Sequence, residues 1–168
     1  MQNKLKLVAA AALLSTLSPA VWADVKIGFL ATLSGPSADV GRDQYDGFTL
    51  ALEQLNGKLG DTKAVVIRED DQQKPDVALT GLAKLLDKDK VDVVVGLTFA
   101  NVMMALQNRI AATDTPFVGT VAGPSPAAGA QCKPNQFVMS WQSDVPAEVV
   151  GKYLTDKSVK RIKATLNK

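Results

Sequence analysis

The sequence contains no histidine and only one cysteine, and both shortages limit the chemistry that the chain can perform. Zinc sites of the usual kind need several cysteine or histidine ligands, so the composition excludes them. Cysteine–histidine catalysis is excluded for the same reason, and no serine has a histidine to activate it. Neither a Gly-x-Ser-x-Gly motif nor a phosphate-binding glycine motif is present. We therefore expect a protein that is not an enzyme and that carries no metal or other cofactor.

The single cysteine, Cys132, leaves two interpretations open. It is either a semi-buried thiol or one half of a disulfide whose partner lies beyond the end of this chain.

Long apolar runs are also scarce, and one of them lies near the amino end. The run from Leu7 to Leu17 follows the charged residues Lys4 and Lys6, and Val21-Trp22-Ala23 suits the positions that a signal peptidase reads. The run has about 11 residues, whereas a membrane span needs roughly 20. We predict a signal peptide over residues 1–23, cleavage after Ala23 and a periplasmic location.

Charge of one sign is not in excess. The chain has 19 basic and 17 acidic residues, and the loss of Lys4 and Lys6 with the signal peptide leaves 17 of each, a net charge of zero. No basic patch remains that would indicate a nucleic-acid partner. The 145 residues after Ala23 suffice for one domain with a proper core but not for two large lobes.

Short apolar runs closed by turn residues predict four buried parallel strands. They lie at Val25–Leu30, Ala64–Ile67, Val91–Val95 and Phe117–Val118. Apolar stripes at helical spacing alternate with them, from Tyr45 to Leu55, from Ala78 to Leu86 and from Val102 to Ile110. This alternation predicts an α/β fold, a doubly wound parallel sheet in a flavodoxin-like three-layer αβα arrangement.

Residues that are typical of helix ends and turns refine this prediction. Asn56-Gly57 is expected to end the first helix, and Pro75 suits the first turn of the second. A further strand is expected at Gln136–Trp141 and a further helix at Pro146–Leu154, while Ala122–Gln131 is predicted to be a long irregular stretch.

Three loops that follow predicted strands are small, polar and uncharged: residues 32–38, 96–101 and 119–125. In an open parallel sheet, ligands bind at the carboxyl ends of the strands. Short side chains let a ligand approach backbone N–H groups and helix amino ends, which hold a carboxylate well. The loops therefore predict a cradle for a small carboxylate. The alternative is that glycine, serine and proline are only what tight strand-to-helix turns require.

Two groups of side chains near these loops have more than one interpretation. The acidic cluster Glu69-Asp70-Asp71 could hold Mg²⁺, but we expect Asp70 and Asp71 to cap turns, or Asp70 to orient a binding loop. Phe99 and Trp141 could stack on a ligand or belong to the core.

Several short motifs, considered together, are typical of one protein family. They are Val25-Lys26-Ile27-Gly28-Phe29-Leu30, Leu33-Ser34-Gly35-Pro36, Asp46-Gly47-Phe48 with Ala51, Asp70-Asp71 and Val94-Val95-Gly96. The set resembles the type I periplasmic solute-binding proteins of branched-chain amino acid ABC importers. Gly123-Pro124-Ser125 and Ser140-Trp141-Gln142-Ser143-Asp144 resemble the subgroup that takes up aromatic acids and related carboxylates.

The resemblance implies a two-lobed clamp that closes on an amino acid or small carboxylate and delivers it to a permease in the inner membrane. It implies a monomer, with the first lobe at residues 24–143 and the crossover and an incomplete start of the second lobe at residues 144–168. The resemblance implies ligand-binding roles for residues of the loops after the third and fourth strands and for a side chain near Val40; those loop residues are Ala100, Asn101, Val121, Ala122 and Gly123. The composition of the loops adds Ser34 and Phe99 as candidate ligand-binding residues.

Two departures from the family pattern alter these expectations. Ala100 stands where many relatives carry a serine, so only its backbone N–H is available there. Family members run to roughly twice this length, and the basic residues of the stretch 158–168 suit a buried strand poorly. We therefore expect a truncated or frame-shifted product without its second lobe, which binds solute weakly or not at all.

Two other functions remain as alternatives. One is an exported ligand-sensing domain of the same fold, and the other is a periplasmic Mg²⁺-dependent enzyme on a flavodoxin-like sheet.

Overall fold

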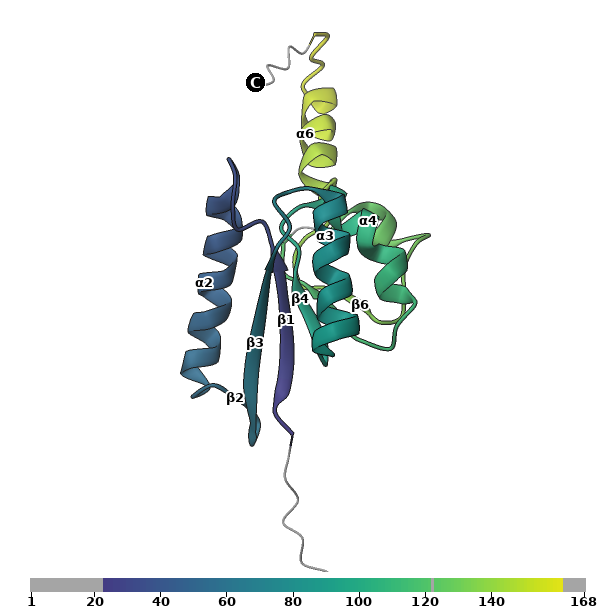
Figure 1. Ribbon diagram of the computed structural model, residues 1–168. Coiled ribbons are helices and arrows are strands. Elements are labelled where there is room, and N and C mark those ends of the chain that lie inside the picture. The colour runs from purple at the N-terminus through teal and green to yellow at the C-terminus, as the bar shows by residue number, and fades with distance from the viewer. Residues whose placement is uncertain (1–22, 122, 162–168) are drawn as a thin grey trace, which may run out of the picture.

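The structure is a computed structural model that describes residues 23–121 and 123–161, so the predicted signal peptide lies outside the described residues (Figure 1). The strands are β1 (Val25–Ala31), β2 (Lys58–Leu59), β3 (Thr62–Asp70), β4 (Val93–Gly96), β5 (Phe117–Gly119) and β6 (Gln136–Val138). The helices are α2 (Ala38–Gln54), α3 (Pro75–Ala83), the π-helix η2 (Lys84–Asp89), α4 (Ala100–Ala111), α5 (Ser125–Ala128) and α6 (Val145–Asp156).

One sheet organises the chain, with the strand order β2-β3-β1-β4-β5-β6. All neighbouring strands are parallel except β2 and β3, which form an antiparallel hairpin. Helix α2 covers one face of the sheet, and α3, η2 and α4 cover the other (Figure 1). The prediction of a doubly wound α/β fold is confirmed.

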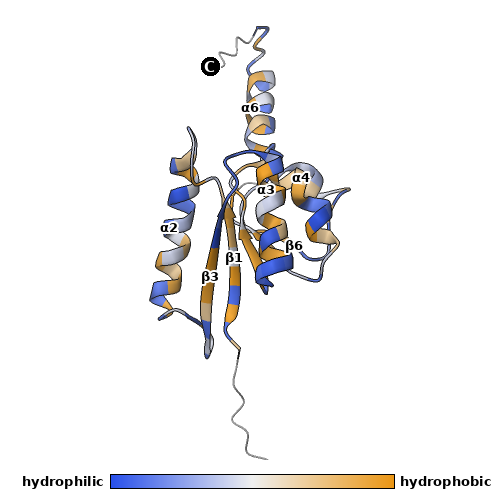
Figure 2. Cartoon of the chain, in the orientation of Figure 1, coloured by the Kyte–Doolittle hydropathy of each residue, from blue (hydrophilic) through white to orange (hydrophobic). Residues whose placement is uncertain are grey.

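Strand β1 supplies the core on both faces because successive side chains of a strand point in opposite directions. Leu30 packs among the buried apolar side chains of α3, η2 and α4. Phe29 points to the other face, where its ring centroid lies 4.9 Å from that of Tyr45 and 5.1 Å from that of Phe48. Figure 2 shows the corresponding hydrophobic stretches along β1 and β3.

Helix α2 ends where the sequence predicts. Asn56 and Gly57 adopt positive φ values of 54° and 69°, a conformation that favours asparagine and glycine. The N–H of Gly57 donates to the carbonyl of Leu52 at 2.9 Å, which closes the last turn of the helix. The chain then forms the short β2–β3 hairpin, which the sequence analysis missed because β2 has only two residues.

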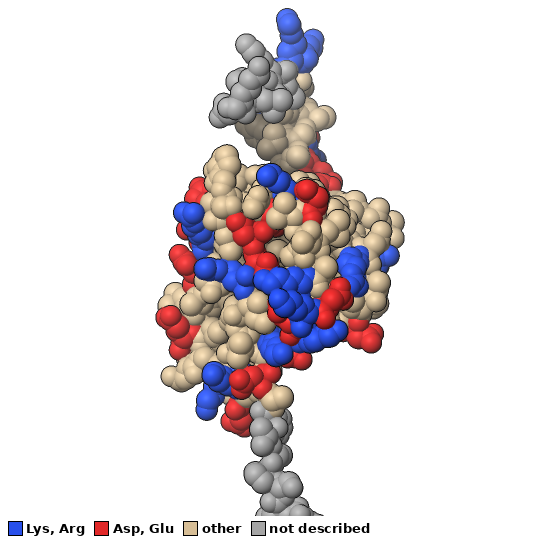
Figure 3. Space-filling view, viewed as in Figure 1, with Lys and Arg blue, Asp and Glu red and all other residues tan. Residues whose placement is uncertain are grey.

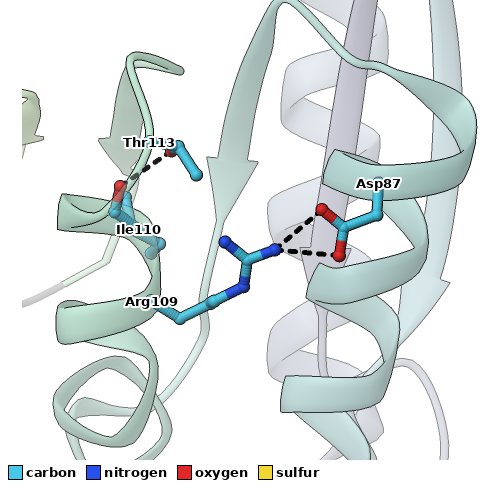
Figure 4. A network of polar contacts seen from close by, with 4 residues as sticks. All are labelled: Asp87, Arg109, Ile110 and Thr113. Carbon is cyan, nitrogen blue, oxygen red and sulfur yellow. Dashed lines mark hydrogen bonds and ion pairs between the residues drawn. The ribbon is translucent and has the colours of Figure 1, made fainter.

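Charged side chains of both signs are interspersed over the face seen in Figure 3, so no large single-sign patch appears on this face. One ion pair joins η2 and α4, which lie on the same face of the sheet (Figure 4). Nη2 of Arg109 on α4 lies 2.7 Å and 2.8 Å from the two carboxylate oxygens of Asp87 on η2. Both side chains are partly exposed, so the pair contributes at most about 1 kcal/mol to stability. Just beyond the end of α4, the hydroxyl of Thr113 donates to the carbonyl of Ile110 at 2.8 Å, which closes this turn (Figure 4).

Two expectations for the last third of the chain are wrong. The stretch predicted to be irregular contains the short helix α5, in which Pro126 takes an early helical position that suits proline. Cys132 is exposed rather than semi-buried.

The expected last strand and last helix are confirmed as β6 and α6, although β6 ends three residues earlier than predicted, at Val138. No helix among the described residues has both the length and the apolar character that a membrane span requires.

Candidate functional site

The loops after β1 and β4 meet at the carboxyl edge of the sheet. The chain runs outward from β1 to β3 and then returns across β1 to β4, so the direction of winding reverses between β1 and β4. Ligands bind at such a switch point in open α/β sheets. Here the N–H of Thr32 donates to the hydroxyl of Thr98 at 3.1 Å, and the N–H of Leu97 donates to the carbonyl of Leu30 at 2.7 Å.

Gln44 of α2 joins the loop after β5 to this pair of loops. Its amide oxygen accepts a hydrogen bond from the Thr98 hydroxyl at 3.0 Å, and its amide nitrogen donates to the hydroxyl of Thr120. The N–H of Thr120 in turn donates to the carbonyl of Gly96 at 3.2 Å. The structure therefore brings the described residues of the three predicted loops together along one rim, which we call the carboxyl rim: residues 32–38, 96–101, 119–121 and 123–125.

The buried carboxylate of Asp71 anchors this rim from below. Its Oδ1 accepts hydrogen bonds from the Thr32 hydroxyl at 2.5 Å and from the N–H of Gln73 at 2.8 Å. Within the described part of the chain, its Oδ2 is buried and has no hydrogen-bond partner. A buried carboxylate that loses a hydrogen-bond donor is poorly compensated, so the contact between Thr32 and Asp71 is costly to break. The contact therefore fixes the end of β1.

Asp70 holds the loop after β1 from its other side. Its Oδ1 accepts from the N–H groups of Leu33 and Gln72, each at 2.9 Å. Burial by itself would raise the pKa of Asp70, but the Ser34 hydroxyl and the N–H groups of Gln72, Leu33 and Ser34 outweigh it, so the pKa lies below the ordinary value of 3.8. The expectation that Asp70 and Asp71 cap turns, and that Asp70 orients a loop, is confirmed.

Two glycines allow backbone segments to approach closely beneath the rim. A Cβ on Gly41 of α2 would overlap the carbonyl oxygen of Thr32, so α2 can lie against the end of β1 only without a side chain there. Gly96 has a φ of 127°, and a Cβ on it would overlap the carbonyl of Leu30. Both positions therefore require glycine for reasons of space, and Gly96 also for its backbone conformation.

The first turn of α4 presents free backbone donors to the rim. Ala100 and Asn101 are its first residues, and the first intrahelical bond reaches Phe99 only from the N–H of Met103 at 3.1 Å. No side chain caps this helix end, and its first turn contains no acid, whereas α2, α3 and α6 each carry one there. The N-terminal partial positive charge of α4 is thus uncompensated and could attract an anion.

The other predicted site residues have different surroundings. Phe99 is half-buried and packs against the core on the α4 side, whereas Trp141 is exposed. Ser34 is half-buried and already donates its hydroxyl to Asp70. Val40 lies in the first turn of α2 with an exposed side chain.

The loop after β5 is only partly available to a ligand. Val121 is half-buried, and Ala122 lies outside the described residues. The N–H of Gly123 donates to the carbonyl of Trp141 at 3.2 Å, so it does not point to a ligand in this conformation. Gly123 instead helps to line a small hollow of about 160 Å³.

A larger hollow of about 540 Å³ lies on the β3 side of the rim. Its lining side chains carry two positive and two negative charges: Leu33, Arg42, Tyr45, Asp46, Arg68 and Asp70. The guanidinium of Arg68 lies 5.0 Å from the centroid of the Tyr45 ring, which fixes one wall. In the described part of the chain, no three histidine, cysteine, aspartate or glutamate side chains come together to hold a metal ion.

Gln44, which lies on α2 and contacts the rim, was not predicted from the sequence. It stands four residues before Phe48 and therefore on the helix face that packs against the sheet. A polar residue within the extended apolar stripe of a helix was the available signal, because such a side chain needs a hydrogen-bond partner when it is buried.

Solved structures of three bacterial binding proteins resemble the fold. An ABC transporter substrate-binding protein from Sphaerobacter thermophilus is 30% identical with a TM-score of 0.70, over 82% of this chain and 38% of that protein. A solute-binding protein of an ABC transporter from R. palustris, in complex with benzoate, is 27% identical with a TM-score of 0.76 over the same shares. An extracellular ligand-binding receptor from Rhodopseudomonas palustris HaA2 is 28% identical with a TM-score of 0.70, over 82% of this chain and 37% of that protein.

The chain thus spans less than two fifths of the length of these proteins. No curated protein sequence matches it. The sequence profile of one family covers nearly all of the described residues. Residues 24–164 match the profile of the periplasmic binding proteins, and the chain belongs to this family.

Proposed function

We propose that this chain provides one wall of a solute-binding cleft in the substrate-binding component of an ABC importer, and that its solute is a small carboxylate such as an aromatic acid. The observation that carries the proposal is the 27% identical R. palustris protein, which has the same fold over 82% of this chain and is in complex with benzoate. The proposed wall is the carboxyl rim, with the first turn of α4 at its centre.

The chemistry of the rim supports an anionic solute. The first-turn N–H groups of α4 have no partner within the helix, and no acid lies among the first residues. The hydroxyls of Thr98 and Thr120 are engaged by Gln44, so they hold the loops in place rather than compete for the solute. A carboxylate at this helix end would receive backbone hydrogen bonds and a favourable dipole interaction.

Binding is best tested on the mature chain, residues 24–168, by NMR titration with benzoate and with neutral benzamide as the comparison. One wall contacts only one side of a solute, so we expect a dissociation constant on the order of millimolar. Benzoate should shift the amide signals of residues 100–102, and benzamide should shift them much less. Equal shifts for both compounds, or shifts confined to other parts of the chain, contradict the proposal.

A negative charge in the first turn of α4 tests solute binding without disrupting the fold. Asn101→Glu places a negative charge in the first turn of α4, which should stabilise the helix by about 0.3–1 kcal/mol but repel benzoate and abolish its binding. Asn108→Glu is the matched control, because Asn108 is also exposed but lies near the other end of α4. It should leave the benzoate shifts unchanged.

We also propose that the protein works in the periplasm and passes its solute to a permease of the inner membrane. The predicted signal peptide and the family support this location. Fractionation of cells that express the whole chain, followed by sequencing of the amino terminus, should recover a periplasmic product that begins at Asp24. A product that keeps Met1 in the cytoplasm argues against export.

A further inference from the structure

One continuous chain of hydrogen bonds crosses the sheet along the carboxyl rim. It joins residues that lie within two positions of the ends of β3, β1, β4 and β5, in that order across the sheet: Asp71, Thr32, Thr98 and Thr120. The Thr32 hydroxyl donates to Asp71 at 2.5 Å, and the Thr32 N–H donates to the Thr98 hydroxyl at 3.1 Å. Between Thr98 and Thr120 the chain passes through a residue outside the sheet, Gln44 of α2.

Gln44 reaches this position because α2 lies close to the end of β1. Gly41 lies three residues earlier, on the same side of the helix, and its lack of a side chain lets it meet the Thr32 carbonyl. Gln44 therefore points to the rim and is half-buried. Its amide suits the bridge, because it offers an acceptor and a donor at the end of one side chain. Oε1 accepts from the Thr98 hydroxyl at 3.0 Å, and Nε2 donates to the Thr120 hydroxyl.

The turn that Gln44 holds is under backbone strain. Gly96 has a φ of 127°, and Leu97 has a φ of 59°, in the left-handed region that residues with a side chain rarely adopt. The side chain of Leu97 is buried, and its N–H donates to the Leu30 carbonyl at 2.7 Å. The next residue, Thr98, carries the bonds to Thr32 and Gln44. A strained conformation persists where surrounding contacts hold it, so loss of a contact lets the turn relax.

This turn sets the position of the first turn of α4. Phe99 follows Thr98, and α4 begins at Ala100, so a single residue separates the Gln44 contact from the helix. The backbone bond from Thr120 to the Gly96 carbonyl joins the two strand ends, and Gln44 adds a link further out, at Thr98. Gln44 thus fixes the first turn of α4 relative to the loop after β5.

We propose that Gln44 is a positioning residue for solute binding. Its amide holds the strained turn at Leu97 and so keeps the free N–H groups of α4 directed at the solute. Both polar atoms of its side chain are engaged by hydroxyls, which leaves contact with the solute to the backbone of α4. This inference rests on the proposed function, because it concerns the same helix end, and it adds a residue from α2 that determines affinity.

The first test is hydrogen exchange of residues 24–168 without solute. Gln44→Met keeps the length of the side chain but removes the amide. The amides of Leu97 and Thr120 should then lose protection by about tenfold or more, because the turn opens locally. Gln44→Glu is the conservative variant, since its carboxylate accepts from both hydroxyls once that of Thr120 rotates, and it should retain the protection. Unchanged protection in Gln44→Met, or an equal loss in Gln44→Glu, overturns the proposal.

The second test is the benzoate titration of the same chain. If the turn without the amide is correctly placed about one tenth of the time, the dissociation constant of Gln44→Met rises about tenfold. Phe48→Leu is the matched control, because Phe48 lies one turn further along α2 and packs against Phe29, with ring centroids 5.1 Å apart. Both variants should lower the urea midpoint, but Phe48→Leu should bind benzoate as the unmodified chain does.

The outcomes separate this proposal from the proposed function. Equal affinity of Gln44→Met and the unmodified chain overturns the role of Gln44 alone, and the proposed function stands. A Phe48→Leu variant that binds as weakly as Gln44→Met also overturns it, because general loosening of α2 then explains the loss. If the unmodified chain does not bind benzoate, the proposed function fails and the solute-binding role of Gln44 fails with it.

Discussion

The hydroxyl of Thr32 decides how well the buried carboxylate of Asp71 is compensated. Thr32→Val keeps the shape of the side chain but removes a 2.5 Å hydrogen bond to a buried acceptor. We expect the free energy of unfolding to fall by about 1.5–3 kcal/mol, the range for hydrogen bonds to charged groups. Urea denaturation at pH 7 measures the change. Thr80→Val is the control, because the exposed Thr80 hydroxyl donates only to a carbonyl within α3, and its loss should cost under about 0.5 kcal/mol.

Asp70 should make stability depend on pH. Its folded-state pKa lies below 3.8, so the folded chain binds this proton less readily than the unfolded chain does. The contribution to stability is therefore complete well above pH 4 and is lost as the pH falls through the lowered pKa. The urea midpoint of Asp70→Asn should fall less between pH 7 and pH 2 than that of the unmodified chain. A parallel loss in both proteins would contradict this assignment, and Asp61→Asn in the exposed hairpin serves as the control.

The two glycines of helix α2 should respond to alanine in opposite ways. Gly41→Ala forces a Cβ against the Thr32 carbonyl and should destabilise the fold by about 1–3 kcal/mol, as overpacking does. A Cβ on Gly47 meets nothing within 4 Å, so Gly47→Ala should stabilise the helix by about 0.5–1 kcal/mol. Thermal unfolding of the two variants compares the same substitution in the same helix. Equal shifts would show that helix propensity, and not space beneath the rim, governs both positions.

The central strands could be predicted because their residues are apolar on both faces and mostly buried. Strands such as β1 and β4 are then continuous apolar runs, and the helices between them carry stripes that face the sheet. Helix α2 begins at Ala38, well before its predicted stripe from Tyr45, since its first turns are small and polar where they pass the rim. Strand β2 and helix α5 are too short to produce a periodic pattern in the sequence.

The meeting of the three loops could be predicted from the sequence, but the contacts that join them could not. Loop composition after β1, β4 and β5 predicted the rim, because parallel strands end at a common edge. The contacts that join the loops are tertiary, such as Gln44 with Thr98 and Thr120, and no local pattern specifies them. The use of the Gly123 N–H by Trp141 likewise depends on the pairing beyond β6, which the sequence did not define.

Across the whole molecule, stability should be distributed unevenly. The central strands β1 and β4 are buried and paired on both sides, whereas α6 has no buried residue. A helix of 12 residues is only marginally stable in water without packing. In hydrogen exchange of the dilute mature chain, amides of residues 145–156 should exchange orders of magnitude faster than those of residues 27–30. Similar protection of both segments at low concentration would contradict this distribution.

The brevity of the outermost strands affects how copies of the chain can associate. Strand β6 has only three residues, so that flank of the sheet offers few free backbone groups to an incoming strand. On the other flank β2 pairs only with Thr62 and Lys63, and the outer edge of β3 beyond them ends in the charged residues Arg68, Glu69 and Asp70, which oppose strand addition. Growth by strand addition, which leads to amyloid-like fibrils, is therefore disfavoured even though apolar side chains such as Phe137 are exposed.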